Sequence, residues 1–143
     1  YKTMTINEGQ ITFTDYDEGM AYAKENNMPV FLDFNGFGCV NCRKMEAAVL
    51  SKPEVAEHMH KYVLISLIVD DKTKLAEPIT VEENGKTVTL KTVGDKWSHM
   101  QRAHYQSNAQ PYYVQLDAAG NRIVEGSYAY DEDIEKFLKW LKY

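Results

Sequence analysis

Two dense apolar runs, at residues 30–34 and 63–69, dominate the hydrophobic pattern of the chain. Both runs have the length of strands and are rich in β-branched or aromatic residues, which predicts two strands buried at the centre of a sheet. The first run follows Pro29, ends before Gly36 and contains one carboxylate, Asp33. Residues 10–13 alternate between polar and apolar positions and predict a short additional strand.

Helical spacing of apolar residues predicts helices between these strands. We expect a first helix that starts at Asp15 and is stopped by Pro29, because proline cannot continue a helix. A second helix is expected from about Cys39 to residue 50. Two capping boxes mark helix starts, formed by Asp15 with Glu18 and by Ser51 with Glu54.

In the C-terminal half, predicted helices and strands again alternate. Residues 97–105 predict a short helix, and residues 112–116 predict a strand that a turn joins to a returning strand at 122–127. Asp131 is expected to cap the last helix. Its apolar stripe follows i, i+3, i+4, i+7 spacing and consists of Ile134, Phe137, Leu138 and Leu141.

Residues 74–96 have the pattern of an inserted hairpin. Asn84-Gly85 is the strongest short signal for a two-residue turn. A turn there pairs Glu83 with Lys86, Val81 with Val88 and Ile79 with Leu90, which brings the apolar residues to one face. We therefore expect a single α/β domain over residues 1–143, with a central mixed sheet, flanking helices and this hairpin as an insertion.

Composition narrows the possible functions. The chain has 143 residues, of which 44% are hydrophobic and 26% charged. These fractions are typical of a globular domain. The net charge is −5 and no basic block stands out, so nucleic acid is not an expected partner. No apolar run approaches the length that spans a bilayer, roughly 18–20 residues, so we expect no membrane insertion by this domain.

The two cysteines carry the clearest chemical signal. Cys39 and Cys42 have C-x-x-C spacing, directly after a predicted strand and at the start of a predicted helix. Backbone N–H groups and the helix dipole stabilise a thiolate at such a position, so Cys39 is the expected nucleophile. Cys42, one turn deeper, is the expected resolving thiol, which attacks a mixed disulfide between Cys39 and a substrate.

Other interpretations of the cysteine pair are weaker. A structural zinc site needs four ligands, and His58 and His60 point in different directions on a helix. A purely structural disulfide across so short a loop constrains little entropy of the unfolded chain. Inert thiols are the remaining alternative. We expect no metal and no cofactor apart from a redox-active Cys39–Cys42 disulfide.

Two carboxylates are candidate partners of the thiols. Burial of Asp33 would raise its pKa toward the working range, so that it can take the proton from Cys42. The alternative for Asp33 is an edge-facing residue in a wrongly assigned strand. Glu46 shares a helix face with Cys42 and Cys39 and would disfavour a thiolate there. The alternative for Glu46 is a solvated surface residue.

The segment from residue 31 to residue 46 resembles the active-site segment of the thioredoxin superfamily, and most closely that of the C-terminal thioredoxin-like domain of DsbD thiol:disulfide interchange proteins. The resemblance rests on valine after Cys39, on the position of Asp33 in the strand and on Glu46 as the second carboxylate. It implies a thioredoxin-like fold. It also implies that Pro111 is the cis-proline of the family, which would expose backbone groups to an extended substrate segment.

The rim of the site departs from the family pattern. Gly38 stands where tryptophan is usual, with Phe37 as a partial replacement, and Gln110 precedes Pro111 where a small or β-branched residue is usual. These four residues are the expected substrate-binding groups. No lysine on the second apolar strand is available to pair with Asp33. Further candidates for the groove lining are Trp97, His99 and His104.

The resemblance implies a protein-disulfide reductase in a bacterial periplasm or other extracytoplasmic space, tethered to the inner membrane in a longer protein. Its partners would be disulfide-bearing proteins and an upstream thiol donor, such as a membrane domain of the same protein. Two alternatives stay open. One is an oxidase or isomerase with a very acidic Cys39, and the other is a redox-inactive module that holds peptides at Pro111.

Overall fold

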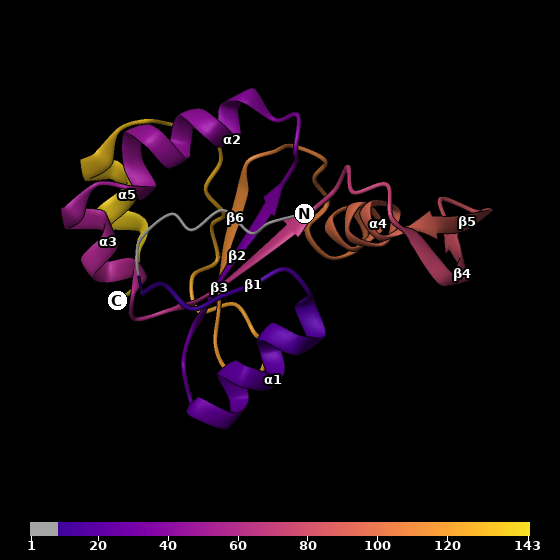
Figure 1. Cartoon of the computed structure of the whole chain (residues 1–143), viewed down its shortest axis with the longest axis horizontal. Helices are drawn as coiled ribbons and strands as arrows, with labels where there is room; N and C mark the ends of the chain where they lie inside the picture. The colour runs from indigo at the N-terminus through magenta and orange to yellow at the C-terminus, as the bar shows by residue number, and fades with distance from the viewer. Residues whose placement is uncertain (1–8) are drawn as a thin grey trace.

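The computed structural model describes residues 9–143, which form a four-stranded sheet, a separate two-stranded sheet and helices around them (Figure 1). In the larger sheet the strand order is β1-β3-β2-β6. Strands β1, β2 and β3 run parallel, and β6 is antiparallel to β2. The bounds are Thr12–Phe13 for β1, Val30–Asn35 for β2, Val63–Ile68 for β3 and Tyr112–Leu116 for β6. The predicted mixed sheet is confirmed.

Helices cover both faces of this sheet (Figure 1). One side carries α2 (Val40–Met45), the π-helical turn η1 (Glu46–Leu50), α3 (Pro53–Met59) and α5 (Ile134–Trp140), and the other carries α1 (Tyr16–Asn26) and α4 (Val93–Tyr105). Successive residues of a strand face opposite sides. Phe31 accordingly belongs to the core under α5, whereas Leu32 and Phe34 belong to the core under α1 and α4. The two apolar runs of the sequence are thus buried on both faces.

The inserted hairpin forms with the predicted register. Strands β4 (Lys74–Glu83) and β5 (Lys86–Thr92) pair antiparallel, with Val81 opposite Val88 and Ile79 opposite Leu90. Asn84 and Gly85 both have positive φ, at 53° and 76°. A tight two-residue turn requires such values. Figure 1 shows the hairpin projecting away from the main sheet beside α4.

Helices α4 and α5 start at residues other than those predicted, because different residues cap them. Helix α4 begins at Val93, four residues before Trp97, where Thr92 accepts a hydrogen bond from Asp95 N–H at 3.0 Å and completes a capping box. Asp133, and not Asp131, caps α5. The predicted capping box at the start of α1 is present on one side, since Asp15 accepts from Glu18 N–H at 3.0 Å.

The capping box predicted at Ser51 is wrong. The Ser51 hydroxyl donates to the carbonyl oxygen of Ala47 at 2.9 Å, so it closes the preceding turn. Helix α3 starts after Lys52 with Pro53 in its first turn, where a proline lacks no needed N–H group. Helix α1 ends at Asn26, and its C-cap Asn27 has a left-handed φ of 51°, so the helix stops before Pro29 is reached.

The returning strand predicted at residues 122–127 is also wrong. The segment contacts β6 only through isolated bridges, between Leu116 and Arg122 and between Tyr113 and Tyr128. Arg122 instead donates hydrogen bonds to Glu125 O at 2.8 Å and Ser127 Oγ at 3.1 Å. These local contacts bend the segment away from a continuous ladder.

Candidate active site

Cys39 and Cys42 form a disulfide at the junction between β2 and α2. Cys39 caps the helix, because its sulfur accepts a hydrogen bond from the N–H of Cys42 at 3.1 Å. Cys39 is half-buried, whereas Cys42 is buried. Only the first sulfur is therefore open to a partner, which is the asymmetry that the nucleophile and resolving roles require.

Asp33 lies in the middle of β2 and is buried, so the edge-facing alternative does not apply. Its neighbours across the sheet are Ser66 on β3 and Tyr113 on β6, and neither carries a positive charge. Burial, and next the charge of Glu46, raise the pKa of Asp33 to about 8. A carboxyl group with this pKa can take up or release a proton near neutral pH.

Glu46 is also buried, with 8% of its surface exposed, so it is not a solvated surface residue. It begins η1, directly after α2, four positions beyond Cys42 on one continuous helix. Residues at this spacing are neighbours on a helix surface. Burial raises the pKa of Glu46, while the Arg43 guanidinium, 3.3 Å away, and the amide of Asn35 oppose the shift.

The structure joins these carboxylates through Asn35, to which the sequence analysis assigned no role. The Asn35 amide nitrogen donates to Asp33 Oδ2 at 3.2 Å and to Glu46 Oε2 at 3.3 Å. Its carbonyl oxygen accepts from the N–H of Gly36 at 2.7 Å and from the Arg43 guanidinium. The i, i+2 spacing of Asp33 and Asn35 on a strand was the available signal, because it places both on one face.

Asp70 is the second residue that sequence reasoning missed. Its carboxylate accepts hydrogen bonds from the backbone N–H groups of Phe37 at 2.7 Å and Gly38 at 3.0 Å. Asp70 follows β3, and β3 runs parallel to β2. The carboxyl ends of adjacent parallel strands meet at one edge of a sheet. Asp70 thereby holds the loop that leads into Cys39.

The expected substrate-binding residues come from the loop before Cys39 and from the segment before β6. The Gln110–Pro111 peptide bond is cis, as the resemblance implied. The Gln110 side chain donates to Gln101 Oε1 at 2.8 Å, and Gln101 is itself buried. Phe37 and Val40, on either side of Cys39, are 43% and 65% exposed. Large exposed apolar side chains beside a reactive sulfur are suited to contact a protein partner.

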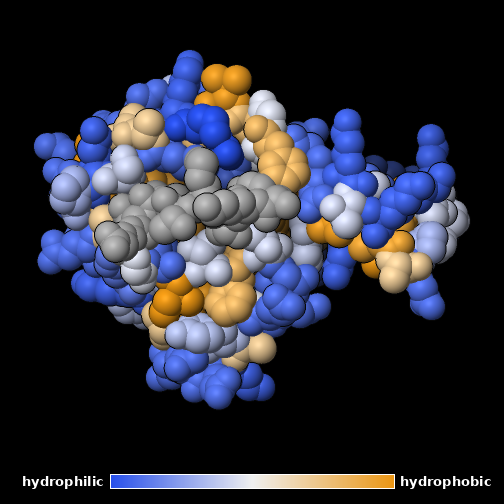
Figure 2. Space-filling model, in the orientation of Figure 1, coloured by the Kyte–Doolittle hydropathy of each residue, from blue (hydrophilic) through white to orange (hydrophobic). Residues whose placement is uncertain are grey.

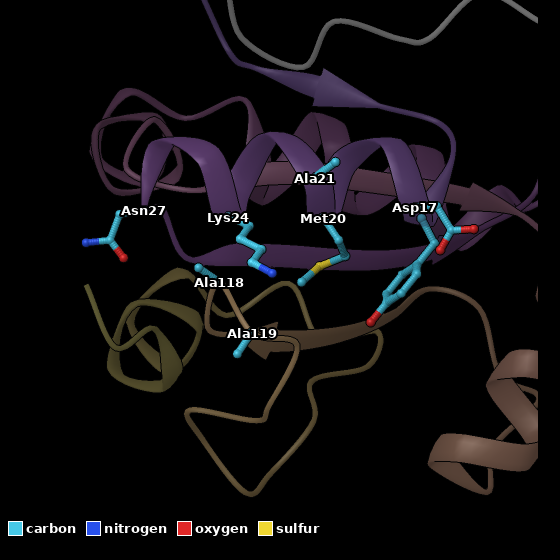
Figure 3. Close-up of a pocket in the computed structure, with 8 residues that line it drawn as sticks. Asp17, Met20, Ala21, Lys24, Asn27, Ala118 and Ala119 are labelled. Carbon is cyan, nitrogen blue, oxygen red and sulfur yellow. The ribbon is translucent and has the colours of Figure 1, made fainter.

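Trp97, His99 and His104 line a cavity elsewhere, between α4 and the hairpin, with a volume of about 460 Å³. Hydrophobic residues gather on this side of the projecting hairpin (Figure 2). A second hollow lies between α1 and the turn after β6, where Met20 and Lys24 point toward Ala118 and Ala119 (Figure 3). No residue of the segment from Asp33 to Glu46 lines either hollow.

Within residues 9–143, no group of three or more histidine, cysteine or acidic side chains is arranged to hold a metal ion. His58 Nδ1 lies 2.8 Å from the carbonyl oxygen of Tyr143, at the end of the chain. In the same described part, no helix is long and apolar enough to cross a bilayer.

The chain belongs to the thioredoxin-like domain family, whose sequence profile matches residues 16–143. This membership agrees with the fold and with the position of the cysteine pair. Together, the fold and the Cys39–Cys42 disulfide place the chain in the class of thiol–disulfide oxidoreductases.

Several solved structures share the fold. A thioredoxin from Thermus thermophilus is 22% identical, with a TM-score of 0.64 over 94% of this chain and 85% of that one. The reduced C-terminal domain of DsbD from Neisseria meningitidis is 20% identical, with a TM-score of 0.61 over 88% of this chain and 90% of that one. A DsbH oxidoreductase is 21% identical, with a TM-score of 0.57 over 99% of this chain and 92% of that one. No curated protein sequence matches the chain.

Proposed function

We propose that the chain is a protein-disulfide reductase that transfers electrons from Cys39 and Cys42 to disulfides of partner proteins. The observation that carries this direction is the pair of buried carboxylates, Asp33 and Glu46, on the strand and the helical turn that flank the cysteine segment. A negative charge near a thiol disfavours its thiolate. Strong oxidants of this class owe their high potential to a stabilised reduced form. A Glu46 carboxylate, and that of Asp33 once it ionises, acts the other way, so the acidic pair favours a cysteine pair that gives up electrons.

Arg43 is the one positive group that acts on this acidic pair among the described residues, and its guanidinium is bound to Glu46 and Asn35. The positive charge of Arg43 therefore interacts mainly with Glu46 and Asn35. Because Arg43 is engaged with Glu46 and Asn35, its charge is not committed to stabilising a thiolate, which supports the reductase over an oxidase with a very acidic Cys39.

The exchange proceeds in two steps that conserve atoms and electrons. The Cys39 thiolate attacks one sulfur of a partner disulfide, so a mixed disulfide forms and one partner thiolate leaves. Cys42 then transfers its proton to the Asp33 carboxylate, and the new Cys42 thiolate attacks the Cys39 sulfur. The Cys39–Cys42 disulfide forms, and the second partner thiolate leaves and takes up a proton. Two electrons have passed to the partner.

The raised pKa of Asp33 suits this residue to accept the proton of Cys42. Burial raises the pKa of Asp33 to about 8. The raised pKa narrows the gap to a thiol, whose ordinary pKa is about 8.5, and so lowers the free-energy cost of the transfer. A carboxylate with its ordinary pKa would be a far weaker base for a thiol.

We further propose an extracytoplasmic location, with disulfide-bearing proteins as acceptors and an upstream thiol protein as donor. The support is the sequence resemblance to the C-terminal domain of DsbD and the shared fold. A membrane-impermeant thiol reagent, applied to intact cells after mild reduction, should label Cys39. Labelling that requires cell lysis would contradict this location.

The exchange mechanism is tested with a disulfide-linked peptide pair as the probe. Reduced Cys42→Ser protein should retain one peptide as a mixed disulfide on Cys39, because the resolving thiol is missing. Cys39→Ser protein should retain none, since the remaining thiol is buried. Absence of the adduct from Cys42→Ser protein at every redox poise would contradict the mechanism.

A further inference from the structure

Asn35 occupies a central position in the buried network, where every hydrogen-bonding group of its amide is used. An amide offers two donors and two acceptor lone pairs. The two donors serve Asp33 and Glu46, and the carbonyl oxygen serves Gly36 and Arg43. The side chain is only 3% exposed, so water does not compete for these groups.

The orientation of the Asn35 amide is fixed by its partners. A backbone N–H and a guanidinium can only donate, so the carbonyl oxygen must face Gly36 and Arg43. The NH₂ group must then face the two carboxylates, which in ionised form only accept. A rotated amide would lose favourable contacts on both sides. The network thus holds two N–H donors pointed at the acidic pair.

We propose that Asn35 is a positioning residue for proton transfer, which holds the Asp33 and Glu46 carboxylates in place and stabilises their ionised forms during thiol–disulfide exchange. The proposal rests on the proposed function for its kinetic part. It does not follow from the C-x-x-C motif, since it concerns the strand residue two positions after Asp33.

Several elements pack against Asp33 and Glu46, and each contributes charged, titratable or polar groups. Arg43 lies on α2 and Glu46 on η1, and Tyr113 faces Asp33 from β6. Ser66 faces Asp33 from β3 and carries no charge. Burial and then the charge of Asp33 raise the pKa of Tyr113 well above its usual value, so Tyr113 stays neutral. Asn35 and Arg43 are therefore the groups that counteract burial of the acidic pair.

The first test is a carboxyl ¹³C NMR titration of oxidised protein, which needs no partner and no reductase activity. Asn35→Leu removes both donors at similar volume. We expect the titration midpoints of both the Asp33 and Glu46 carboxyl carbons to move to higher pH, because hydrogen bonds from N–H groups favour the ionised form. Unchanged midpoints would overturn the proposal.

Gln115→Leu is the matched control. Gln115 is also fully buried, and its side chain bonds with Tyr62 and Trp140, both outside the cysteine segment. Its loss should lower stability without moving either carboxyl midpoint. Equal shifts in both variants would mean general loosening of the core and would overturn the role of Asn35.

A measurement on the unsubstituted protein keeps the proposal testable if Asn35→Leu does not fold. The side-chain NH₂ signals of Asn35 should shift with pH at the same midpoint as the Asp33 carboxyl carbon. Signals that stay constant through that midpoint would contradict the contact. The kinetic readout follows: at pH 6, resolution of the mixed disulfide should be roughly three- to tenfold slower in Asn35→Leu than in the unsubstituted protein, as expected for the net loss of a typical intramolecular hydrogen bond.

Failure of this proposal and failure of the proposed function give different results. If the carboxyl midpoints shift but the cysteine pair proves to be an oxidant, Asn35 keeps its positioning role and the direction of electron flow is wrong. If the pair is a reductant but the midpoints and the rate at pH 6 are unchanged, the reductase stands and the role of Asn35 is refuted.

Discussion

Asp33 and Glu46 form one buried acidic pair, although they lie on a strand and on a helical turn that follow one another through the cysteine segment. The charge of Glu46 acts on Asp33 strongly enough to contribute, after burial, to its raised pKa. Asp33 Oδ1 and Glu46 Oε1 are buried and have no hydrogen-bond partner among the described residues. A change in the charge of Glu46 is therefore expected to move the pKa of Asp33.

The pair should make the stability of the oxidised protein depend on pH. Burial raises the pKa of Asp33 from 3.8 to about 8, so the folded state binds a proton that the unfolded state has released. Its contribution to stability is complete below the unfolded pKa and is lost as pH rises through the folded pKa. Each pH unit in this window costs about 1.4 kcal/mol.

Asp33→Asn removes this dependence, because the amide does not ionise. Urea unfolding at pH 5 and pH 8 should show that the variant gains stability relative to the unsubstituted protein as pH rises. Asp17→Asn, at an exposed aspartate, should leave the pH dependence as it is. An identical slope for Asp33→Asn and the unsubstituted protein would contradict the raised pKa.

The same substitution should slow catalysis. Without the Asp33 carboxylate, Cys42 loses the base that the mechanism assigns to it, and general-base assistance is typically worth about 10²–10⁴-fold. Solvent water partly replaces it here, so we expect resolution of the mixed disulfide to slow by roughly 10–100-fold at pH 7. Rapid-quench measurement of mixed-disulfide decay checks this value. A rate within about twofold of the unsubstituted protein would remove Asp33 from the mechanism.

Glu46 should tune the redox potential. Glu46→Gln removes a buried negative charge beside the cysteine pair, which favours thiolates and stabilises the reduced form. We expect the reduction potential to rise by roughly 20–30 mV, a change of about 1 kcal/mol. Glu54→Gln, at an exposed glutamate on α3, is the control and should leave the potential unchanged. A constant potential in Glu46→Gln would show that Arg43 already cancels this charge, and a lower potential would contradict the role assigned to Glu46.

Asp70 should matter for the geometry of the loop before Cys39. Asp70→Ala leaves the N–H groups of Phe37 and Gly38 without their carboxylate acceptor. We expect a loss of about 1–2 kcal/mol in stability and slower attack by Cys39 on a peptide disulfide. Asp71→Ala removes only a local side-chain bond to Thr73, at 2.9 Å, and should lower stability without slowing exchange. Equal exchange rates in the two variants would assign Asp70 a purely structural role.

The sequence analysis found those parts of the site that local patterns encode. Cys39 and Cys42 are recognisable from their spacing, Asp33 from its place inside an apolar strand, and the hairpin register from the turn at Asn84-Gly85. Each of these signals lies within a few residues of the chain, so pattern and propensity suffice to predict it.

The remaining parts depend on side-chain contacts that the hydrophobic pattern does not specify. Asp70 meets Phe37 across 33 positions of sequence, and only the parallel pairing of β2 and β3 brings them together. Asn35 has four partners, none of which a hydrophobic pattern specifies. The wrong helix starts at Ser51 and Asp131 are local, since no side chain caps α3 and the neighbouring Asp133 caps α5.

The reduction potential of the Cys39–Cys42 pair tests the central claim most directly. Equilibration of the purified protein with defined thiol–disulfide buffers, followed by alkylation and mass measurement, gives the value. The account predicts a potential near or below about −220 mV, in the range of thioredoxins and glutaredoxins. A potential near about −120 mV would make the pair a strong oxidant and contradict the proposed direction of electron transfer.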